Sequence, residues 1–346
     1  MLPVELYMAL GFMLSAYAIV ANDAIQTLGT FIAANQHRSW VMIWAFSATI
    51  LSVVLIYGWI ANEGDPAYSR LDSFPFDVNQ FGPLCLLPPL VLLGLTRFGL
   101  PVSTTFLILT FFRDKNLYSM VTKSLMGYAL AITLGLICFR AVRSALKRSA
   151  RPQGRAATWW TVAQWTSTGF LWSQWLIQDL ANLFVYFPRE SVGGTRITLN
   201  WLLFGLLSMI VMQIFIFREG GGKIQQIVNE KSGTSDVREA TIISLVYGAI
   251  ILFFKEYNSM PMSTTWVFLG LLAGREVAYR LSDRESLKGA WQMIGSDLLK
   301  ATIGLLVSVV IAISLPWLSE KNEQNQNTTP SASPAMTNPT QEVEKN

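Results

Sequence analysis

Three adjacent hydroxyl side chains follow a proline at two places in this chain, each inside an apolar stretch. They stand in LPVSTTFLIL and MPMSTTWVFL and are Ser103, Thr104, Thr105, Ser263, Thr264 and Thr265. Hydroxyl residues after a proline favour a helix start, where unpaired backbone N–H groups attract an oxyanion. The other interpretation of one such run is hydrogen bonding back to the preceding helical turn. The repetition favours a polar binding site.

An aspartate with amide neighbours also occurs twice within apolar segments. The two groups are Asn22, Asp23 and Gln26 in ANDAIQT, and Gln178, Asp179 and Asn182 in IQDLANL. An ionised carboxylate inside a membrane helix is costly without a partner, so such residues mark a site or a pathway. The amides offer oxygen ligands to a cation and N–H donors to an anion. A structural polar contact between helices is the alternative.

The composition predicts that helices carry these residues across a membrane. Hydrophobic residues make up 52% of the chain and charged residues 14%. Several runs of about 20 apolar residues are long enough to cross a bilayer as helices. The chain begins without the basic region of a cleavable signal, so we expect its start to be the first span. One histidine and two separated cysteines exclude a His-rich metal centre and a disulfide framework.

Both polar motifs recur in the same order and at nearly the same spacing. Asp179 follows Asp23 by 156 residues, and Pro261 follows Pro101 by 160. We interpret this pattern as an internal duplication. The predicted division is a first membrane repeat at 1–139, a basic cytoplasmic linker at 140–157, a second membrane repeat at 158–317 and a disordered polar tail at 318–346.

The charges of the connecting segments predict the topology of the first half. Residues 140–155 carry six Lys or Arg and no acid, which places them in the cytoplasm. Loop 62–78 has four acids and one Arg, so we expect it outside. An odd number of crossings must separate these two segments, and segment 118–139 supplies one. Segment 81–112 must therefore cross an even number of times, although its arm after Pro101 is too short to span alone. A re-entrant hairpin with its tip near residues 103–105 satisfies both conditions.

The charges predict the opposite orientation for the second half. Loops 218–238 and 274–288 carry four Lys or Arg each and share the cytoplasmic side, with a hairpin at 239–273 between them. Both termini then lie outside. The predicted fold class is an all-α polytopic membrane protein of two inverted-topology repeats with broken helices and re-entrant hairpins. Loop 188–196 fits less well, because it should lie outside yet carries two arginines.

Two lysines occur in equivalent places near the start of the last span of each half. Lys123 and Lys300 both stand in a Lys-x-x-x-Gly pattern. We interpret them as side chains that extend to the membrane interface, where long basic residues place their charge in water.

The motifs resemble those of the PiT family of inorganic phosphate transporters, and the similarity covers both halves in the right order. Each half of that family holds an Asn-Asp motif and a Pro-Val-Ser-Thr-Thr-His motif. The resemblance implies a cation-coupled symporter of inorganic phosphate, driven by sodium or a proton, that works by alternating access.

The family's site residues are carried over position by position. The resemblance implies that the substrate binds among Ser103, Thr104, Thr105, Ser263, Thr264, Thr265, Gln26 and Asn182. It implies that Asn22, Asp23, Gln178 and Asp179 serve the coupling ion and the substrate. Asp23 and Asp179 are then the candidate ligands of a sodium ion.

This sequence departs from the family pattern at several positions. Phe106 and Trp266 replace the histidine after each Ser-Thr-Thr run. Gln178 stands where the second half of the family has Asn, and Gln26 where the first half has its second Asn. The chain is therefore a divergent member of the pattern, without the family histidine at either position.

We expect that the protein is not an enzyme and that it needs no cofactor other than the coupling ion. Its expected partners are inorganic phosphate and the lipid bilayer, without nucleic acid, and a homodimer is left open. We expect a multi-pass protein of a bacterial inner membrane or a plasma membrane. The alternatives are a transporter of another tetrahedral oxyanion such as sulfate, an intramembrane hydrolase with paired Asp or a Thr nucleophile, and a non-transporting membrane regulator.

Overall fold

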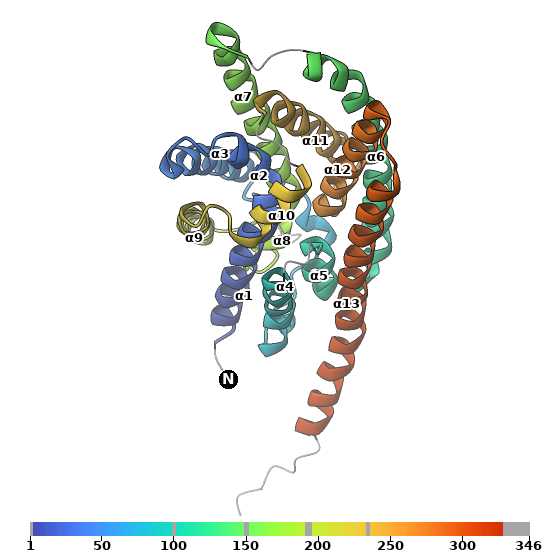
Figure 1. Ribbon diagram of the computed structural model, residues 1–346. Coiled ribbons are helices and arrows are strands. Elements are labelled where there is room, and N and C mark those ends of the chain that lie inside the picture. The colour runs from blue at the N-terminus through green and yellow to red at the C-terminus, as the bar shows by residue number, and fades with distance from the viewer. Residues whose placement is uncertain (1–2, 99–101, 149–151, 191–195, 233–235, 328–346) are drawn as a thin grey trace, which may run out of the picture.

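The chain folds into a bundle of helices whose two halves carry similar elements in the same order (Figure 1). The computed structural model describes residues 3–98, 102–148, 152–190, 196–232 and 236–327. The first half contains α1 (Val4–Ile19), a π-helical turn (Val20–Ala24), α2 (Ile25–Ala34), α3 (Trp40–Ala61), α4 (Leu87–Arg97), α5 (Thr104–Phe112) and α6 (Leu117–Arg148). The second half contains α7 (Gly154–Asp179), α8 (Ala181–Phe184), α9 (Leu199–Arg218), α10 (Gly222–Ser232), α11 (Val237–Tyr257), α12 (Thr264–Asp283) and α13 (Lys288–Asn327). Short 3-10 turns lie at Leu71–Ser73, Val78–Gln80, Pro83–Leu86 and Asp114–Asn116.

Within the described residues, six helical segments are long and apolar enough to cross a membrane. They are Val4–Ala34, Trp40–Ala61, Asp114–Arg143, Leu199–Arg218, Val237–Tyr257 and Lys288–Ile311. Large aliphatic side chains such as Val53, Leu299 and Val310 are exposed on these helices. Extended apolar surface of this kind is typical of contact with lipid. The prediction of an all-α polytopic membrane protein is confirmed.

Helices α4 and α5 form a hairpin that begins and ends on one face of the bundle. They have 11 and 9 residues, fewer than the about 20 that a span needs. The Gln80 side chain donates to the Phe112 carbonyl at 3.2 Å, and the rings of Phe81 and Phe112 are 5.7 Å apart. The two ends therefore lie side by side, as expected of a re-entrant hairpin. Residues 99–101, including Pro101, lie outside the described residues.

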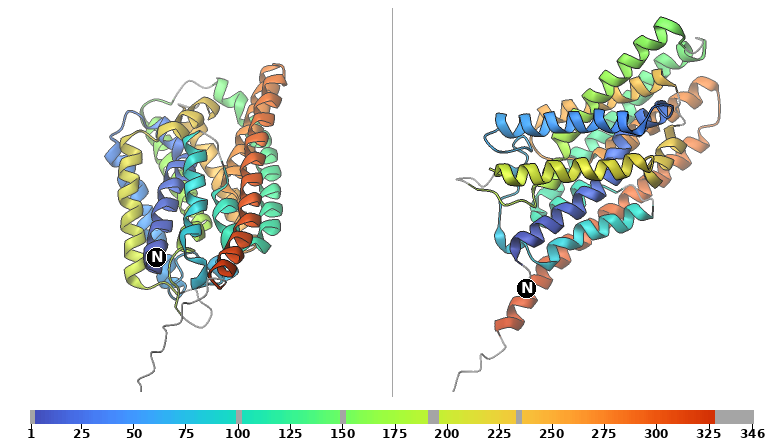
Figure 2. Two further views of the ribbon diagram at one scale, coloured as in Figure 1. Left: turned by 90° about the horizontal axis from the view of Figure 1, so that it is seen from below. Right: turned by 90° about the vertical axis from the view of Figure 1, so that its left-hand side faces the viewer.

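Helices α11 and α12 form the second hairpin, and its two ends lie together. Arg275 of α12 forms an ion pair with Glu239 in the first turn of α11 at 3.0 Å. At the same end, Asp283 of α12 forms an ion pair with Arg143 near the end of α6 at 2.7 Å. This hairpin therefore enters and leaves on the face where α6 ends and α7 begins, which we call the linker face. The N-terminus lies at the opposite end of the bundle, on what we call the N-terminal face (Figure 2, right).

The tip of the second hairpin is held by Lys123, near the start of α6. Its ammonium group donates to the carbonyl oxygens of Asn258 and Met260 at 3.0 and 2.6 Å and to the side-chain oxygen of Asn258 at 2.8 Å. Lys123 is buried. The interpretation that this lysine extends to the membrane interface is therefore wrong, because three oxygen atoms at the hairpin tip bind it inside the protein.

Each hairpin packs against the final helix of the other half. Helix α12 lies along α6, and α5 lies against α13. A Cβ atom at Gly270 would lie 2.6 Å from the Tyr128 carbonyl oxygen, and one at Gly135 would lie 2.7 Å from the Leu271 carbonyl oxygen. Only glycine allows the two backbones to come this close. The exchange of partners joins the two halves into one core.

Three segments differ from the boundaries expected from the sequence. The linker expected at 140–157 is helical up to Arg148 and again from Gly154, because Arg, Lys and Ala are good helix formers. Most of the loop expected at 274–288 belongs to α12, since Arg275 is neutralised by Glu239 inside the bundle. Helix α13 runs to Asn327, so the expected disorder at 318–327 is replaced by helix, while 328–346 lie outside the described residues.

The misplaced charge of loop 188–196 has a local explanation. The Arg189 guanidinium is buried and donates to the carbonyl oxygens of Phe74 and Leu71 at 2.7 and 3.4 Å. Its positive charge therefore fixes residues 62–82, which we call the 62–82 segment, instead of facing the cytoplasm. Residues 191–195 lie outside the described residues.

Single cysteines placed on the two faces test the inverted topology. In a Cys85→Ala/Cys138→Ala background, we expect Asn79→Cys to react with an impermeant maleimide in intact cells, because it directly follows loop 62–78, which is predicted to lie outside. Gln153→Cys and Gln226→Cys are expected to react only after permeabilisation, and all three native positions are exposed. Labelling of Gln226→Cys from the same side as Asn79→Cys would exclude the inverted arrangement.

Candidate functional site

The first aspartate lies on a π-helical turn between α1 and α2. This turn, Val20–Ala24, is one helical turn wound more widely than its neighbours, a feature frequent at functional sites. Asp23 is 1% exposed. Asn22 donates to the Asp23 carboxylate at 2.9 Å, and Gln26 donates to the Asn22 side-chain oxygen at 2.9 Å. The three residues predicted from the motif thus form one hydrogen-bonded chain in the interior.

The second aspartate ends α7, and one residue, Leu180, separates it from the start of α8. Asp179 is also 1% exposed and accepts a hydrogen bond from Asn182 at 2.9 Å. Gln178 turns away from this carboxylate and accepts a hydrogen bond from Arg70 of the 62–82 segment at 3.1 Å. Gln178 and Asn22 occupy equivalent positions in the two motifs but make different contacts.

The two Ser-Thr-Thr runs start α5 and α12 in the same way. The hydroxyl of Ser103 accepts from the Phe106 N–H, and the hydroxyl of Ser263 accepts from the Trp266 N–H, both at 3.3 Å. The serines are therefore helix caps, as the sequence predicts. Capping leaves Thr104, Thr105, Thr264 and Thr265 in the first turn of each helix, where they face the aspartates.

The four threonines bind the two aspartates in a crossed pattern. Asp23 accepts from Thr104 of its own half at 2.5 Å and from Thr265 of the other half at 3.2 Å. Asp179 accepts from Thr264 of its own half at 2.8 Å and from Thr105 of the other half at 3.4 Å. The first threonine of each hairpin thus serves its own repeat, and the second serves the opposite repeat.

Backbone carbonyl groups of the hairpin tips complete the same crossed pattern. Thr105 donates to the Met262 carbonyl oxygen at 3.2 Å, and Thr265 donates to the Val102 carbonyl oxygen at 3.4 Å. Each half-site therefore brings together a carboxylate oxygen, a threonine hydroxyl and a carbonyl oxygen. Hard cations favour such oxygen ligands. The described residues contain no group of three or more His, Cys, Asp and Glu side chains arranged to hold a metal ion.

Asn182 connects both half-sites and leaves one atom without a partner. Its amide donates to Thr104 and Thr105 at 3.3 and 3.2 Å. Its side-chain oxygen is buried with no hydrogen-bond partner among the described residues, as is the side-chain oxygen of Gln26. Such atoms normally find a partner, and here they belong to side chains of the two aspartate motifs. The site therefore retains acceptors for a hydrogen-bonding or charged guest.

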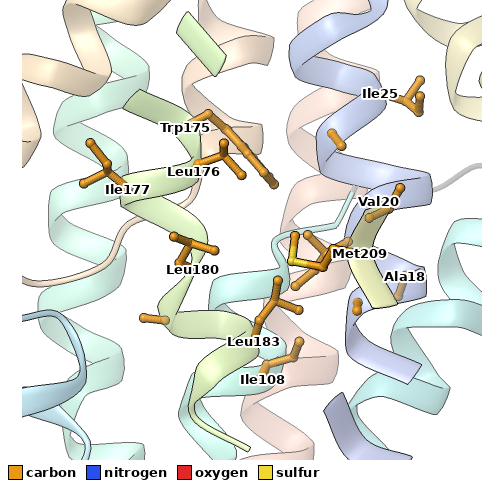
Figure 3. Close-up of a cluster of buried hydrophobic side chains, with 14 of the residues drawn as sticks. Ala18, Val20, Ile25, Ile108, Trp175, Leu176, Ile177, Leu180, Leu183 and Met209 are labelled. Carbon is orange, nitrogen blue, oxygen red and sulfur yellow. The ribbon is translucent and has the colours of Figure 1, made fainter. Parts of the chain in front are cut away.

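Apolar packing surrounds this polar centre. Figure 3 shows Trp175, Leu180 and Leu183 along the α7–α8 segment and Val20 and Ile25 along the opposite interrupted helix. All five side chains are buried. Excluding water in this way strengthens every electrostatic interaction in the centre. The few polar groups present therefore control which ions the centre accepts.

Phe106 and Trp266 meet at the junction of the two hairpins. Their ring centroids are 5.5 Å apart in an edge-to-face arrangement, and both side chains are buried. These are the positions at which the resembling family carries histidines. Aromatic packing here replaces two titratable groups. Among the described residues, the acidic side chains of the centre are therefore Asp23 and Asp179.

Trp175 and Tyr247 contact Thr264 but were not predicted from the sequence. The Trp175 indole N–H donates to the Thr264 hydroxyl at 3.2 Å, and the Tyr247 hydroxyl donates to the Thr264 carbonyl oxygen at 2.9 Å. Trp175 precedes Asp179 by four residues, a spacing that places both on one helix face and could have identified it. Tyr247 has no such sequence indication, because only the folded hairpin brings α11 beside the start of α12.

Comparison with solved structures identifies the fold. The chain is similar to a structure described as "The sodium-dependent phosphate transporter", with a TM-score of 0.64 and 14% sequence identity, over 91% of this chain and 100% of that chain. The two proteins share one fold. The resemblance drawn from the motifs is thus confirmed at the level of the fold, while no family model and no curated protein sequence matches the chain.

The crossed pattern predicts which pairs of residues are energetically coupled. In a double-mutant cycle, Thr265→Val should be strongly non-additive with Asp23→Asn, by about 1 kcal/mol, because one hydrogen bond joins the two side chains. Coupling of Thr265→Val with Asp179→Asn should be smaller. The measurement is the stability of purified single and double variants to unfolding in detergent. Stronger coupling of Thr265 to Asp179 than to Asp23 would contradict the crossed arrangement.

Proposed function

We propose that the chain is a cation-coupled symporter of inorganic phosphate that works by alternating access, with both termini outside. The observation that carries the proposal is the crossed set of threonine–aspartate contacts at the meeting point of two inverted hairpins. Transporters built from inverted repeats hold their substrate and ions at such a junction. The fold shared with a sodium-dependent phosphate transporter supports the same assignment.

The coupling ion follows from the charge of the centre. Two carboxylates repel an incoming anion unless a cation or a proton neutralises them, so the binding of cation and anion becomes mutually dependent. The oxygen atoms around Asp23 and Asp179 include hydroxyl and backbone carbonyl groups, as the contacts of Thr105 and Thr265 demonstrate. A proton needs no such ligands, whereas a sodium ion does. We therefore favour sodium as the coupling ion.

The anion is assigned to the threonine hydroxyls and to the starts of α5 and α12. Backbone N–H groups and the helix dipole attract an oxyanion there without a basic side chain. Phosphate near neutral pH keeps a P–OH group that donates to a carboxylate, whereas sulfate has none. We therefore favour phosphate over sulfate as the substrate.

Uptake by the reconstituted protein tests this assignment. We expect labelled phosphate to accumulate in proteoliposomes under an inward sodium gradient, and to do so far less without it. Asp23→Asn and Asp179→Asn should each abolish accumulation, because each removes a charge that the cation must balance. Asp114→Asn, at an exposed position, should leave uptake unchanged. No uptake under any gradient would support the non-transporting or hydrolase alternatives, and normal uptake in either site variant would place coupling elsewhere.

Competition between anions tests the substrate. A buried acceptor that faces a lone pair instead of a P–OH loses about 1–3 kcal/mol, which corresponds to roughly several-fold to hundredfold discrimination. We therefore expect labelled phosphate uptake at pH 7 to survive a large excess of unlabelled sulfate and to be blocked by the same excess of unlabelled phosphate. Strong inhibition by sulfate would make a sulfate or broad oxyanion transporter the better assignment.

A further inference from the structure

Arg70 is a buried positive charge beside the proposed site, and none of the roles assigned above uses it. Its side chain is 2% exposed. The guanidinium donates to the Tyr68 carbonyl oxygen at 3.3 Å and to the Gln178 side-chain oxygen at 3.1 Å. Its Nε–H has no acceptor, and no carboxylate forms an ion pair with it, within the part of the chain that the structure describes. A buried guanidinium without an anionic partner is costly.

The neighbour of Arg70 also has an unused donor. Gln178 is fully buried, and its side-chain N–H group has no acceptor among the described residues. Because its oxygen binds Arg70, its N–H group and the Arg70 Nε–H belong to one pair of adjacent side chains. Two unpaired donors, one of them charged, complement an oxyanion, for which a guanidinium is the preferred side chain.

The charge of Arg70 acts on the site itself. Burial lowers the pKa of Arg70 to about 10, and Asp179, Asp65 and Glu256 act against this decrease. The guanidinium therefore remains charged at neutral pH. Arg70 thus places one positive charge within electrostatic range of Asp179.

The backbone before Arg70 is built to direct this side chain inward. Tyr68 and Ser69 both have left-handed φ angles, of 54° and 61°, which cost energy in residues with a side chain. Asp65 stabilises the turn by accepting from the N–H groups of Ala67 and Ser69, both at 2.7 Å. The Tyr68 hydroxyl anchors it to the Val54 carbonyl oxygen at 2.8 Å. A strained, well-anchored turn ahead of a buried charge is typical of a functional segment.

The linker face carries a different residue at the corresponding connection. After α9, helix α10 packs on α2, and Gln225 donates to the Gly29 carbonyl oxygen at 2.9 Å. This amide is neutral, and it also donates to the Asn229 side-chain oxygen at 2.7 Å. The two connections therefore carry different buried groups: a guanidinium on the N-terminal face and an amide on the linker face.

We propose that Arg70 and Gln178 form a separate oxyanion site on the N-terminal face, through which phosphate reaches the threonine–aspartate centre. The inference rests on the proposed function for the identity of the anion. The proposal predicts an asymmetry between the two faces. A binding group on the N-terminal face lowers the half-saturating phosphate concentration for transport from that face alone.

Phosphate transport from each face tests this site. Transport is measured in right-side-out and inside-out membrane vesicles. Arg70→Gln should raise the half-saturating phosphate concentration roughly tenfold or more for transport from the N-terminal face only. The maximal rate should change little. Arg70→Lys, which keeps the charge but loses the planar fork, should give a smaller one-sided increase.

Arg189→Gln is the matched control. Arg189 is a buried arginine on the same face that also binds the 62–82 segment, but through carbonyl oxygens of Leu71 and Phe74. We expect it to lower thermal stability without a one-sided change in half-saturation. An equal change from both faces in Arg70→Gln, or the same one-sided change in Arg189→Gln, would show that Arg70 only holds the segment in place.

Phosphate transport by wild-type vesicles tests the proposed function. The ratio of the half-saturating phosphate concentrations of variant and wild type tests the role of Arg70. If wild-type vesicles do not move phosphate, equilibrium dialysis of labelled phosphate against purified protein decides the inference separately. If Arg70→Gln weakens phosphate binding roughly tenfold or more, the site is supported. Equal binding by both proteins overturns it.

Discussion

The structure depends on burying two carboxylates with no basic side chain in contact with either. Within the described residues, Asp23 and Asp179 form no ion pair, and their hydrogen bonds come from hydroxyl and amide groups. Burying an ionised carboxylate costs several kcal/mol unless donors replace the lost water. Each carboxylate therefore needs its threonines and its neighbouring amide, and the elements that carry these donors must be held in place.

This requirement explains how the rest of the chain is arranged. A threonine from the opposite half reaches each aspartate only if both hairpins extend to the same place. The second hairpin is held there by Lys123 at its tip and by Ser124, whose hydroxyl accepts from the Ser263 N–H at 2.8 Å. Glycines let α12 approach α6 closely enough for these contacts. Packing between the halves therefore serves the hydrogen bonds at the centre.

The centre is buried, and different contacts lie toward each face of the bundle. On the N-terminal face, the 62–82 segment contacts Gln178 through Arg70 and is fixed by Arg189. On the linker face, Glu239 binds Arg275 and the Tyr279 hydroxyl, and these contacts join the two helices of the second hairpin. Because the site side chains are buried, an ion or anion can reach them only if part of the surrounding structure moves. The contacts on the two faces involve different residues, as the proposed alternating access requires.

The sequence by itself determined the membrane class, the repeated motifs and most of the side chains that meet at the centre. Hydrophobic runs, repeated motifs and charged loops are local features, and polar groups in apolar segments must meet to be satisfied. Tertiary structure decided which donor serves which acceptor: that Thr265 crosses to Asp23, that Gln178 faces Arg70, and that Lys123 binds a hairpin tip instead of the membrane interface. These pairings join residues up to 242 positions apart. No local pattern encodes them, because they arise from the packing of one half against the other.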